Sequence, residues 1–303
     1  MRVIVAGGSG LIGRKLIGSL LQAHHEVTLI SRTPDKAKKY FTGVHVRFWD
    51  TKNTTALTEI LDGTDVVINL TGESIASKRW TQIQKERILG SRIESTQAIF
   101  GAIRHSQRKP LVLLNASAVG YYGNVPEGEV TESAPKGTGF LADVCSLWES
   151  EALKVQEFGV RVVLLRTGIV LDKQGGALQN ILRPFRFFIG GPLGSGRQWF
   201  PWIHLQDEVS AILFAMENEH ITGSLNLAAP ESVRMTDFCR TLGRILHRPS
   251  WMRVPAWTLK LMLGEMAEPL LLHGQKMIPQ KLIDAGFQFQ FPKLEDALRD
   301  LLA

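Results

Sequence analysis

A glycine-rich turn at the start of the chain restricts its fold more than any other feature. The motif VIVAGGSGLIGRKL at residues 3–16 places three glycines in GxxGxxG spacing, directly after an apolar β-branched run and directly before a helical stretch. Glycines in this context permit a tight turn, let a pyrophosphate approach the backbone and bring the helix close to the strand. The motif therefore predicts a dinucleotide-binding turn with contacts from Gly7, Gly10, Leu11, Ile12 and Gly13.

Short apolar runs alternate with helical stretches through the first half of the chain. The runs are rich in β-branched residues and apolar on both faces, so both faces of the sheet are expected to be covered. This order is typical of an α/β fold, a Rossmann-type doubly wound parallel sheet. We expect strands at 2–7, 26–31, 44–49, 65–72, 110–117 and 160–171, and helices at about 11–23, 79–105 and 138–157.

The alternation stops in the middle of the chain. Residues 173–204 are rich in glycine, aromatic and basic residues, and we expect this segment to leave the sheet and wall a pocket. A helix and a late strand then return, and the remainder is largely helical. We therefore predict an NADP-binding Rossmann domain at 1–171 together with 205–230, and a smaller, mostly helical substrate lobe at 172–204 and 231–303.

Composition and charge exclude several classes of protein. The chain has 44% hydrophobic and 21% charged residues, which is average for a globular protein and argues against disorder. Its two cysteines show no metal-ligand spacing, so we expect free thiols, no metal site and a cytoplasmic or similarly reducing compartment. No apolar run is long enough for a membrane helix, and the net charge of +6 comes from small dispersed groups. We therefore expect neither a membrane nor a nucleic acid as partner.

The end of the expected second strand indicates which dinucleotide the turn holds. An acidic residue at this place accepts hydrogen bonds from the adenosine ribose of NAD, but this chain has Ser31 and Arg32. A guanidinium cannot accept those hydrogens, whereas it pairs well with a 2′-phosphate. NADP is therefore the predicted cofactor, with Arg14 as a second candidate cation. The alternative is that Arg32 is an ordinary surface arginine.

Several motifs resemble the extended short-chain dehydrogenase/reductase superfamily; in chain order they are AGGSGLIG, DVVINLTGE, LLNASAVGYYG and LLRTGIVL. Three longer motifs look like its atypical subgroup of epimerase family proteins, which includes the vertebrate short-chain dehydrogenase/reductase family 39U member. These are NLTGESIASKRWTQIQKERILGSR, GGPLGSGRQWFPWIH and GQKMIPQKLIDAGF. The resemblance covers nearly the whole chain and implies further NADP contacts at Leu70, Thr71, Arg87, Arg92 and Val170.

The residues themselves support part of this set. Leu70 and Thr71 follow a strand at the carboxyl edge of the expected sheet, where ligands bind in doubly wound folds. Arg87 and Arg92 are five residues apart in an expected helix and do not share one narrow stripe. For each arginine the alternative is a solvated or ion-paired surface residue.

The resemblance also identifies where proton-transfer groups belong. A Ser, and a Tyr with a Lys four residues later, perform this role in the superfamily, because the Lys lowers a phenol pKa that is otherwise about 10. Ser117 stands at the serine position, but Leu141 and Cys145 occupy the tyrosine and lysine positions. Neither can replace the missing group. We take Ser117 and Tyr122 as the catalytic candidates; Tyr121, Asp143 and His204 are further options, each with a purely structural alternative.

The segment GGPLGSGRQWFPWIH is the predicted substrate wall. Arg197 can clamp a carboxylate or phosphate, and Trp199 and Trp202 offer flat faces for a ring or sugar. The alternative is an aromatic loop that packs the two lobes together. The predicted substrate pocket comprises Glu73, Arg197, Trp199, Trp202 and His204, and by resemblance Arg79, Gln275 and Lys276 complete it.

Two functions remain open from the sequence. The first is an NADP-dependent oxidoreductase or epimerase that acts on a small polar substrate with altered acid/base groups. The second is a non-catalytic NADP-binding regulatory or sensor protein, which the loss of the Tyr/Lys pair favours. A scaffold without a cofactor is a third, weaker alternative. By analogy with relatives, the helices at 79–105 and 138–157 predict a homodimer.

Overall fold

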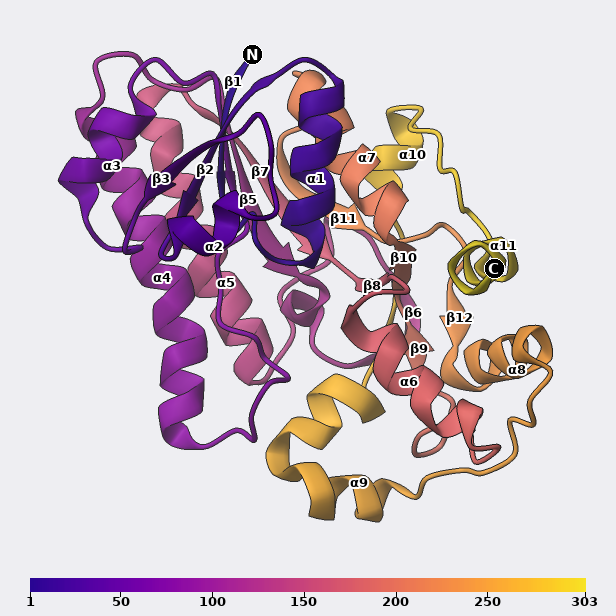
Figure 1. Cartoon of the computed structure of the whole chain (residues 1–303). Coiled ribbons are helices and arrows are strands. Elements are labelled where there is room, and N and C mark those ends of the chain that lie inside the picture. Colours follow the sequence, from indigo (N-terminus) through magenta and orange to yellow (C-terminus); the bar gives the residue numbers. More distant parts are fainter.

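The computed structural model describes all 303 residues and centres on a parallel sheet of seven strands in the order β11-β7-β5-β4-β1-β2-β3 (Figure 1). All neighbours in this sheet run parallel. The order reverses direction at β1, as in a doubly wound fold, so the predicted Rossmann class is confirmed. The strands are β1 (Arg2–Ala6), β2 (Glu26–Ser31), β3 (His45–Phe48), β4 (Val66–Asn69), β5 (Val112–Ala118), β7 (Arg161–Thr167) and β11 (Gly223–Leu227).

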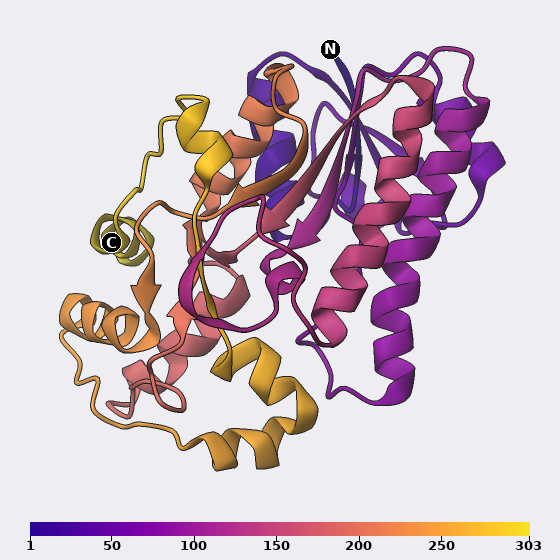
Figure 2. The ribbon, with the colours of Figure 1, turned by 180° about the vertical axis from the view of Figure 1, so that it is seen from behind.

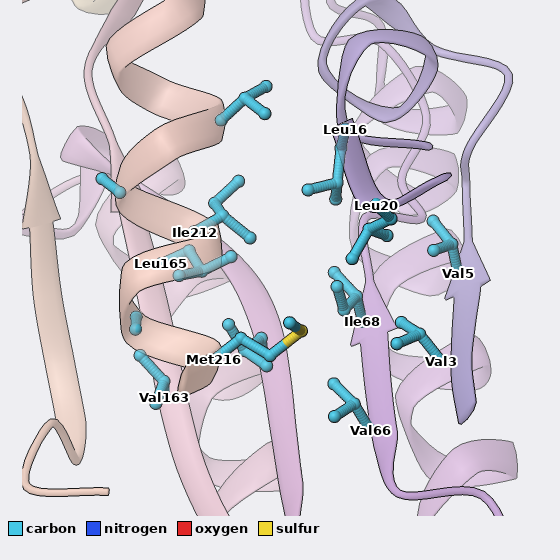
Figure 3. Packing of buried hydrophobic residues seen from close by; sticks show 14 of the residues in the cluster. Val3, Val5, Leu16, Leu20, Val66, Ile68, Val163, Leu165, Ile212 and Met216 are labelled. Atoms are coloured by element: carbon cyan, nitrogen blue, oxygen red, sulfur yellow. The ribbon is translucent and has the colours of Figure 1, made fainter. Parts of the chain in front are cut away.

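Two layers of helices cover the sheet because successive strand residues point to opposite faces. Val3 and Val5 of β1 pack with α1 (Leu11–Gln22) and α7 (Leu205–Glu217), and Figure 3 shows this interlayer core. Ile4 and Ala6 pack on the other side with α3 (Thr54–Leu61), α4 (Gln82–His105) and α5 (Phe140–Leu153). Figure 2 shows α4 and α5 side by side on that face.

A second hydrophobic core lies outside the sheet. It joins α6 (Gly176–Arg186), α8 (Met235–Leu246) and α11 (Leu294–Leu302) around buried residues such as Phe185 and Phe238. Three short strand pairs connect this part to the sheet: β8 (Ile169–Leu171) with β10 (Trp202–His204), β9 (Trp199–Phe200) with β12 (Val233–Arg234), and β6 (Val125–Val130) with β13 (Gln275–Met277). The remaining helices are α2 (Pro34–Lys38), α9 (Ala256–Leu263) and α10 (Gln280–Asp284), with short turns η1 (Val119–Tyr122), η2 (Lys154–Phe158), η3 (Gly264–Met266) and η4 (Glu268–Leu272).

Several expected elements differ from the structure: the strand expected at 65–72 ends at Asn69, and the helix expected at 138–157 ends at Leu153 and is followed by η2. The strand expected at 160–171 is two strands, because the chain bends at Gly168, where a side chain would lie 2.4 Å from the carbonyl oxygen of Pro201. The helix expected from residue 79 begins at Gln82, since Thr81 caps it by accepting a hydrogen bond from the backbone of Gln84. The segment 173–204, expected as an irregular wall, contains α6 and two short strands.

None of the helices combines the length and the apolarity that crossing a membrane requires.

Candidate active site

The glycine turn forms a backbone cradle at the amino end of α1. Gly7 has φ of +79°, and a side chain there would lie 2.6 Å from the carbonyl oxygen of Leu70. A side chain at Gly13 would lie 2.5 Å from the Cα of Gly8. No side chain caps α1, so its first N–H groups remain available to an anion. This cradle, too tight for any side chain, fits the diphosphate of a dinucleotide.

A cavity of about 300 Å³ opens directly above this cradle. Seven of the predicted cofactor-binding residues line it. They come from the glycine turn, from the residue after β4 and from β8: Gly7, Gly10, Leu11, Ile12, Gly13, Leu70 and Val170. Ile169, Gly176 and Ala177, which the sequence analysis did not predict, complete its lining. The cavity thus lies at the carboxyl edge of the sheet, beside the point where strand order reverses.

The end of β2 presents cations and no carboxylate. Ser31 accepts a hydrogen bond from the backbone of Thr33 at 3.1 Å, which shapes the turn that follows β2. Arg32 is exposed and has no carboxylate within ion-pair distance. Arg14 lies over the exposed ring of Tyr40, with its Cζ 5.9 Å from the ring centroid. Both guanidinium groups are therefore free to bind a phosphate.

Thr71 is held by a polar cluster at the end of β4. Its hydroxyl donates to Oδ1 of Asn69 at 2.5 Å and lies 2.7 Å from the hydroxyl of Ser95. The amide of Asn69 donates to Oδ1 of Asn115 at 2.7 Å, which joins the end of β4 to the middle of β5. This cluster was not predicted, although the two asparagines that follow the apolar runs of β4 and β5 are a visible signal.

Arg92 and Arg87 have different environments on α4. Arg92 is largely buried and donates to the carbonyl oxygens of Glu73 and Ile88 at 3.1 and 2.8 Å. Its guanidinium lies against Gly72, and burial lowers its pKa. Arg92 is therefore at the end of β4 beside the cavity. Arg87 is exposed without an internal partner, and its nucleotide contact stays a prediction.

Ser117 belongs to a buried charged network. Its hydroxyl donates to Oε1 of Glu149 at 2.6 Å. Glu149 also accepts two hydrogen bonds from Arg166, both at 2.9 Å. All three residues are at most 5% exposed. Ser117 thus gives its only proton to a carboxylate, and it has none left to donate to a substrate.

Tyr122 is a structural residue, which corrects its predicted catalytic role. It is 1% exposed, accepts a hydrogen bond from Arg166 at 2.9 Å and donates one to Asn226 at 2.6 Å. Burial raises its pKa to about 12. A phenol this buried and this weakly acidic does not exchange protons with a substrate near neutrality. Its neighbour Tyr121 stacks on the same guanidinium, with Cζ of Arg166 at 3.5 Å from the ring centroid.

The two positions that carry Tyr and Lys in the superfamily hold inert side chains. Leu141 packs in a hydrophobic cluster with Trp80, Val144 and Met266. Cys145 is 4% exposed, and burial raises the pKa of its thiol to about 11. Neither position therefore provides a proton donor or a cation.

Asp143 points away from this region. It is exposed and forms an ion pair with Lys136 at 2.5 Å. Because its carboxylate lies in solvent and is bound to Lys136, Asp143 does not replace the missing pair.

Two predicted pocket residues are structural, and this corrects the sequence analysis. Trp202 is 1% exposed in the second core, and its Nε1 donates to the carbonyl oxygen of Glu231 at 2.9 Å. His204 caps α7, where its Nδ1 accepts a hydrogen bond from the backbone of Gln206 at 3.0 Å. Its ring stacks on Phe291 with centroids 4.0 Å apart, and burial lowers its pKa. The pairing of β10 with β8 turns both side chains inward.

The other predicted pocket residues, Glu73, Arg197 and Trp199, do not line the nucleotide cavity. Trp199 is half-buried between two cations, with the Arg234 Cζ at 3.7 Å and the Lys276 Nζ at 5.4 Å from its ring centroid. Arg197 is exposed, and Glu73 lies beside Arg92. Their role in binding a substrate stays a prediction.

The carboxyl-terminal segment meets the site at two places. Gln275 donates to the carbonyl oxygen of Val119 at 2.7 Å, which fixes β13 against η1. Arg79 donates to the carbonyl oxygen of Leu261 at 3.1 Å, and Lys85 pairs with Glu265 at 2.5 Å. No three His, Cys, Asp or Glu side chains are close enough together to hold a metal ion.

Comparisons with known proteins agree with this geometry. Residues 3–228 match the NAD dependent epimerase/dehydratase family, and residues 254–301 match a domain of unknown function, DUF1731. The chain is 40% identical, over its full length and 87% of the relative, to the chloroplastic SDR39U1 homolog, an epimerase family protein of Arabidopsis thaliana. It is 39% identical to the epimerase family protein YfhF of Bacillus subtilis, over all of the chain and 98% of that protein.

Solved structures of epimerase family proteins are also similar to this chain. The human epimerase family protein SDR39U1, crystallised with NADPH, is 35% identical and superposes with a TM-score of 0.89 over 99% of both chains. A UDP-glucuronic acid 4-epimerase from Bacillus cereus superposes with a TM-score of 0.81 over 99% of this chain and 98% of that one. At 19% identity, the second match shows a common fold only.

Proposed function

The chain belongs to the NAD-dependent epimerase/dehydratase family, and we propose that it is an atypical NADP(H)-dependent oxidoreductase or epimerase that acts on a small polar substrate. The observation that carries the proposal is the cavity between the glycine cradle, Leu70 and Val170. Family membership and the NADPH in the human SDR39U1 structure support the same cofactor.

The chain's own residues favour the phosphorylated nucleotide. The backbone N–H groups at the start of α1 face the diphosphate position, and Arg32 offers an unpaired guanidinium for a 2′-phosphate. Ser31 and Arg32 stand at the end of β2, so no acidic side chain occupies the place where NAD-binding chains offer an acceptor to the ribose hydroxyls. NADPH supplies a hydride when bound.

The proton that accompanies hydride transfer needs another source. Leu141 has no proton to give, Cys145 holds its proton tightly, and Ser117 donates to Glu149. Protein groups at these positions therefore orient and enclose the reactants, while water or a group of the substrate exchanges the proton. A reaction of this kind shows no enzyme pKa near 7 in its pH–rate profile.

A second candidate is a non-catalytic NADP-binding sensor, and one observation favours it. The hydroxyl of Ser117 is enclosed by a buried ion pair, and the neighbouring positions 141 and 145 are closed by apolar packing. A site that binds the nucleotide and lacks exchangeable protons is suited to reporting nucleotide occupancy through a partner. This function shares the nucleotide site with the first.

Turnover separates the two candidates. Purified protein is mixed with NADPH and a panel of aldehydes, ketones and nucleotide sugars, and the reduced-nicotinamide absorbance is followed. Turnover that is lost in Gly7→Ala, which fills the nucleotide cradle, and unchanged in the exposed Ser150→Ala variant supports the enzyme. NADPH binding without turnover, together with a partner protein recovered only in the presence of NADPH, supports the sensor. The absence of NADPH binding contradicts both.

A further inference from the structure

The end of α6 carries apolar side chains into solvent. Phe187, Phe188 and Ile189 follow the helix and are 75%, 52% and 46% exposed. Three consecutive large apolar residues in solvent are unusual on a protein that acts alone, because each loses the favourable burial of its side chain. This segment therefore needs a partner to cover it.

The backbone at Phe188 adds a second, independent sign of function. Phe188 has φ of +63°, a left-handed conformation that glycine normally supplies at the end of a helix. Its N–H donates to the carbonyl oxygen of Phe185, and the N–H of Ile189 donates to that of Pro184, which completes the helix-ending motif. An aromatic residue at such a position is strained, and its half-exposed ring gains too little burial to compensate. Strain of this kind is characteristic of functional sites.

Helix α9 presents the same kind of surface. Trp257, Leu261 and Met262 are 68%, 74% and 65% exposed, so the outer face of the helix is apolar where a surface helix is normally polar. Trp251, 68% exposed, lies on the loop that leads into α9.

Backbone hydrogen bonds join this loop to the end of α6. The N–H of Met252 donates to the carbonyl oxygen of Gly190, and the N–H of Val254 donates to that of Pro192. The Arg248 guanidinium also lies over the Phe188 ring, 4.3 Å from the centroid. Figures 1 and 2 both place α9 and this loop at the end of the molecule opposite the amino terminus. We call this apolar end, formed by 187–189 and 251–262, the tip.

The unpaired charge around the tip is positive, because Glu265 and Glu268, which follow α9, pair with Lys85 and Lys260. Residues 173–206 contain four Lys and Arg and no Asp or Glu, and residues 238–264 contain five and likewise none. Only Arg240, Arg244 and Lys260 among these cations pair with a carboxylate, supplied by other segments. Arg183, Arg186 and Arg253 near the tip are exposed and unpaired. The occupant of the tip is therefore anionic.

We infer that the tip docks on the surface of an anionic lipid bilayer. Protruding Trp, Phe and Leu side chains surrounded by Lys and Arg are the pattern of proteins that lie in the membrane interface. A second copy of the chain fits poorly, because a two-fold contact would bring two cationic surfaces together. A protein partner would have to supply pockets for isolated side chains, whereas the bilayer interface accepts them without preformed pockets.

This inference departs from the expectation of no membrane partner. That expectation was based on the lack of a helix that could span a membrane, whereas docking on the surface of a bilayer needs no such helix. The inference does not depend on the proposed NADP chemistry, because the tip lies outside the nucleotide cavity.

Vesicle co-sedimentation of the full chain tests the inference. The vesicles are phosphatidylcholine with or without about one third phosphatidylglycerol, in about 0.1 M salt, where the screening length is about 10 Å. The tip predicts sedimentation with the anionic vesicles only, and weaker binding as salt rises. Arg183→Gln with Arg186→Gln should reduce this binding about tenfold, since each basic residue near the surface contributes to it.

Phe188→Gly is the most informative variant. Glycine suits the left-handed backbone, so this variant folds at least as stably as wild type, yet it loses one inserting side chain. We expect it to weaken vesicle binding severalfold, and the pair Trp257→Ser with Leu261→Ser to weaken it further. Leu111→Ser, which removes a 63% exposed side chain outside the tip, is the matched control and should bind as wild type does.

Three results would overturn the inference. The first is that wild type does not sediment with anionic vesicles. The second is that Leu111→Ser and Phe188→Gly lose vesicle binding equally. The third is that the protein does not bind vesicles but forms a dimer that Phe188→Gly abolishes. The last result would assign the tip to a contact between copies of the chain.

Discussion

The Ser117 hydroxyl donates its hydrogen bond to Glu149 at 2.6 Å, inside a region that excludes water. Because Glu149 is held by Arg166, this hydrogen bond is part of the fold as well as of the site. The serine typical of the family is therefore present in this chain, and its hydroxyl is bound to the structural residue Glu149.

The ion pair between Glu149 and Arg166 should be essential for stability. Both side chains are nearly buried, so Arg166→Met leaves an uncompensated charge and should lower the free energy of unfolding by about 3–5 kcal/mol. Urea denaturation measures the change. Arg240→Met, which breaks an exposed pair with Asp237, should cost less than about 1 kcal/mol. Equal effects of the two variants would show that the buried network is not a major source of stability.

Arg32 should decide between the two nicotinamide nucleotides. Arg32→Asp removes the cation for the 2′-phosphate and adds an acceptor for ribose hydroxyls, so NADPH affinity should fall at least about tenfold while NADH affinity holds or rises. Fluorescence titration with both nucleotides checks this. Arg104→Asp, an equal charge change at the end of α4, should leave the ratio unchanged. Equal losses for NADPH and NADH in Arg32→Asp would contradict the assignment of Arg32.

Two glycines in the amino-terminal region should respond in opposite ways to alanine. Gly7→Ala places a methyl group against the Leu70 carbonyl at positive φ, so it should abolish nucleotide binding and destabilise the protein. Gly18 lies in α1 with open space around its Cα, and Gly18→Ala should stabilise the protein by about 0.5–1 kcal/mol. Thermal unfolding and NADPH titration of both variants test the cradle. Normal NADPH binding by Gly7→Ala would disprove it.

Glu208 should make stability depend on pH. This carboxyl is fully buried; Thr167 donates to one oxygen at 2.8 Å and the other has no partner. Burial raises its pKa from 4.5 to about 8. Between these values the unfolded chain releases the proton that the folded chain keeps, so this group lowers the free energy of unfolding as pH rises from 4.5 to about 8.

Glu208→Gln removes that dependence. The variant should gain stability relative to wild type as pH rises, by up to about 1.4 kcal/mol per pH unit in that window. Denaturation at several pH values measures the difference, with the exposed Glu59→Gln as control. A constant difference between Glu208→Gln and wild type across the window would mean that Glu208 is already ionised in the folded protein.

Much of the fold and of the nucleotide site was predictable, because both depend on local sequence. The glycine spacing and the alternation of strands and helices predicted the Rossmann sheet, and Gly7, Leu70 and Val170 do line one cavity. The network around Arg166 was missed because it joins residues as far apart as Tyr122 and Asn226, which only the sheet order brings together.

Two of the wrong predictions, the pocket roles of Trp202 and His204, have a common physical cause. Trp202 and His204 are aromatic residues in a glycine-rich segment, which suggested an open pocket wall. Pairing of β10 with β8 instead buries them in a second core that the sequence pattern did not reveal. The homodimer and the cytoplasmic location stay predictions.

Calorimetric titration of the wild-type protein with NADPH and with NADH tests the central claim most directly. The cradle at Gly7 and the free guanidinium of Arg32 predict one site that binds NADPH at least about tenfold more tightly than NADH. No heat with either nucleotide on folded protein, or equal affinity for both, would contradict the account.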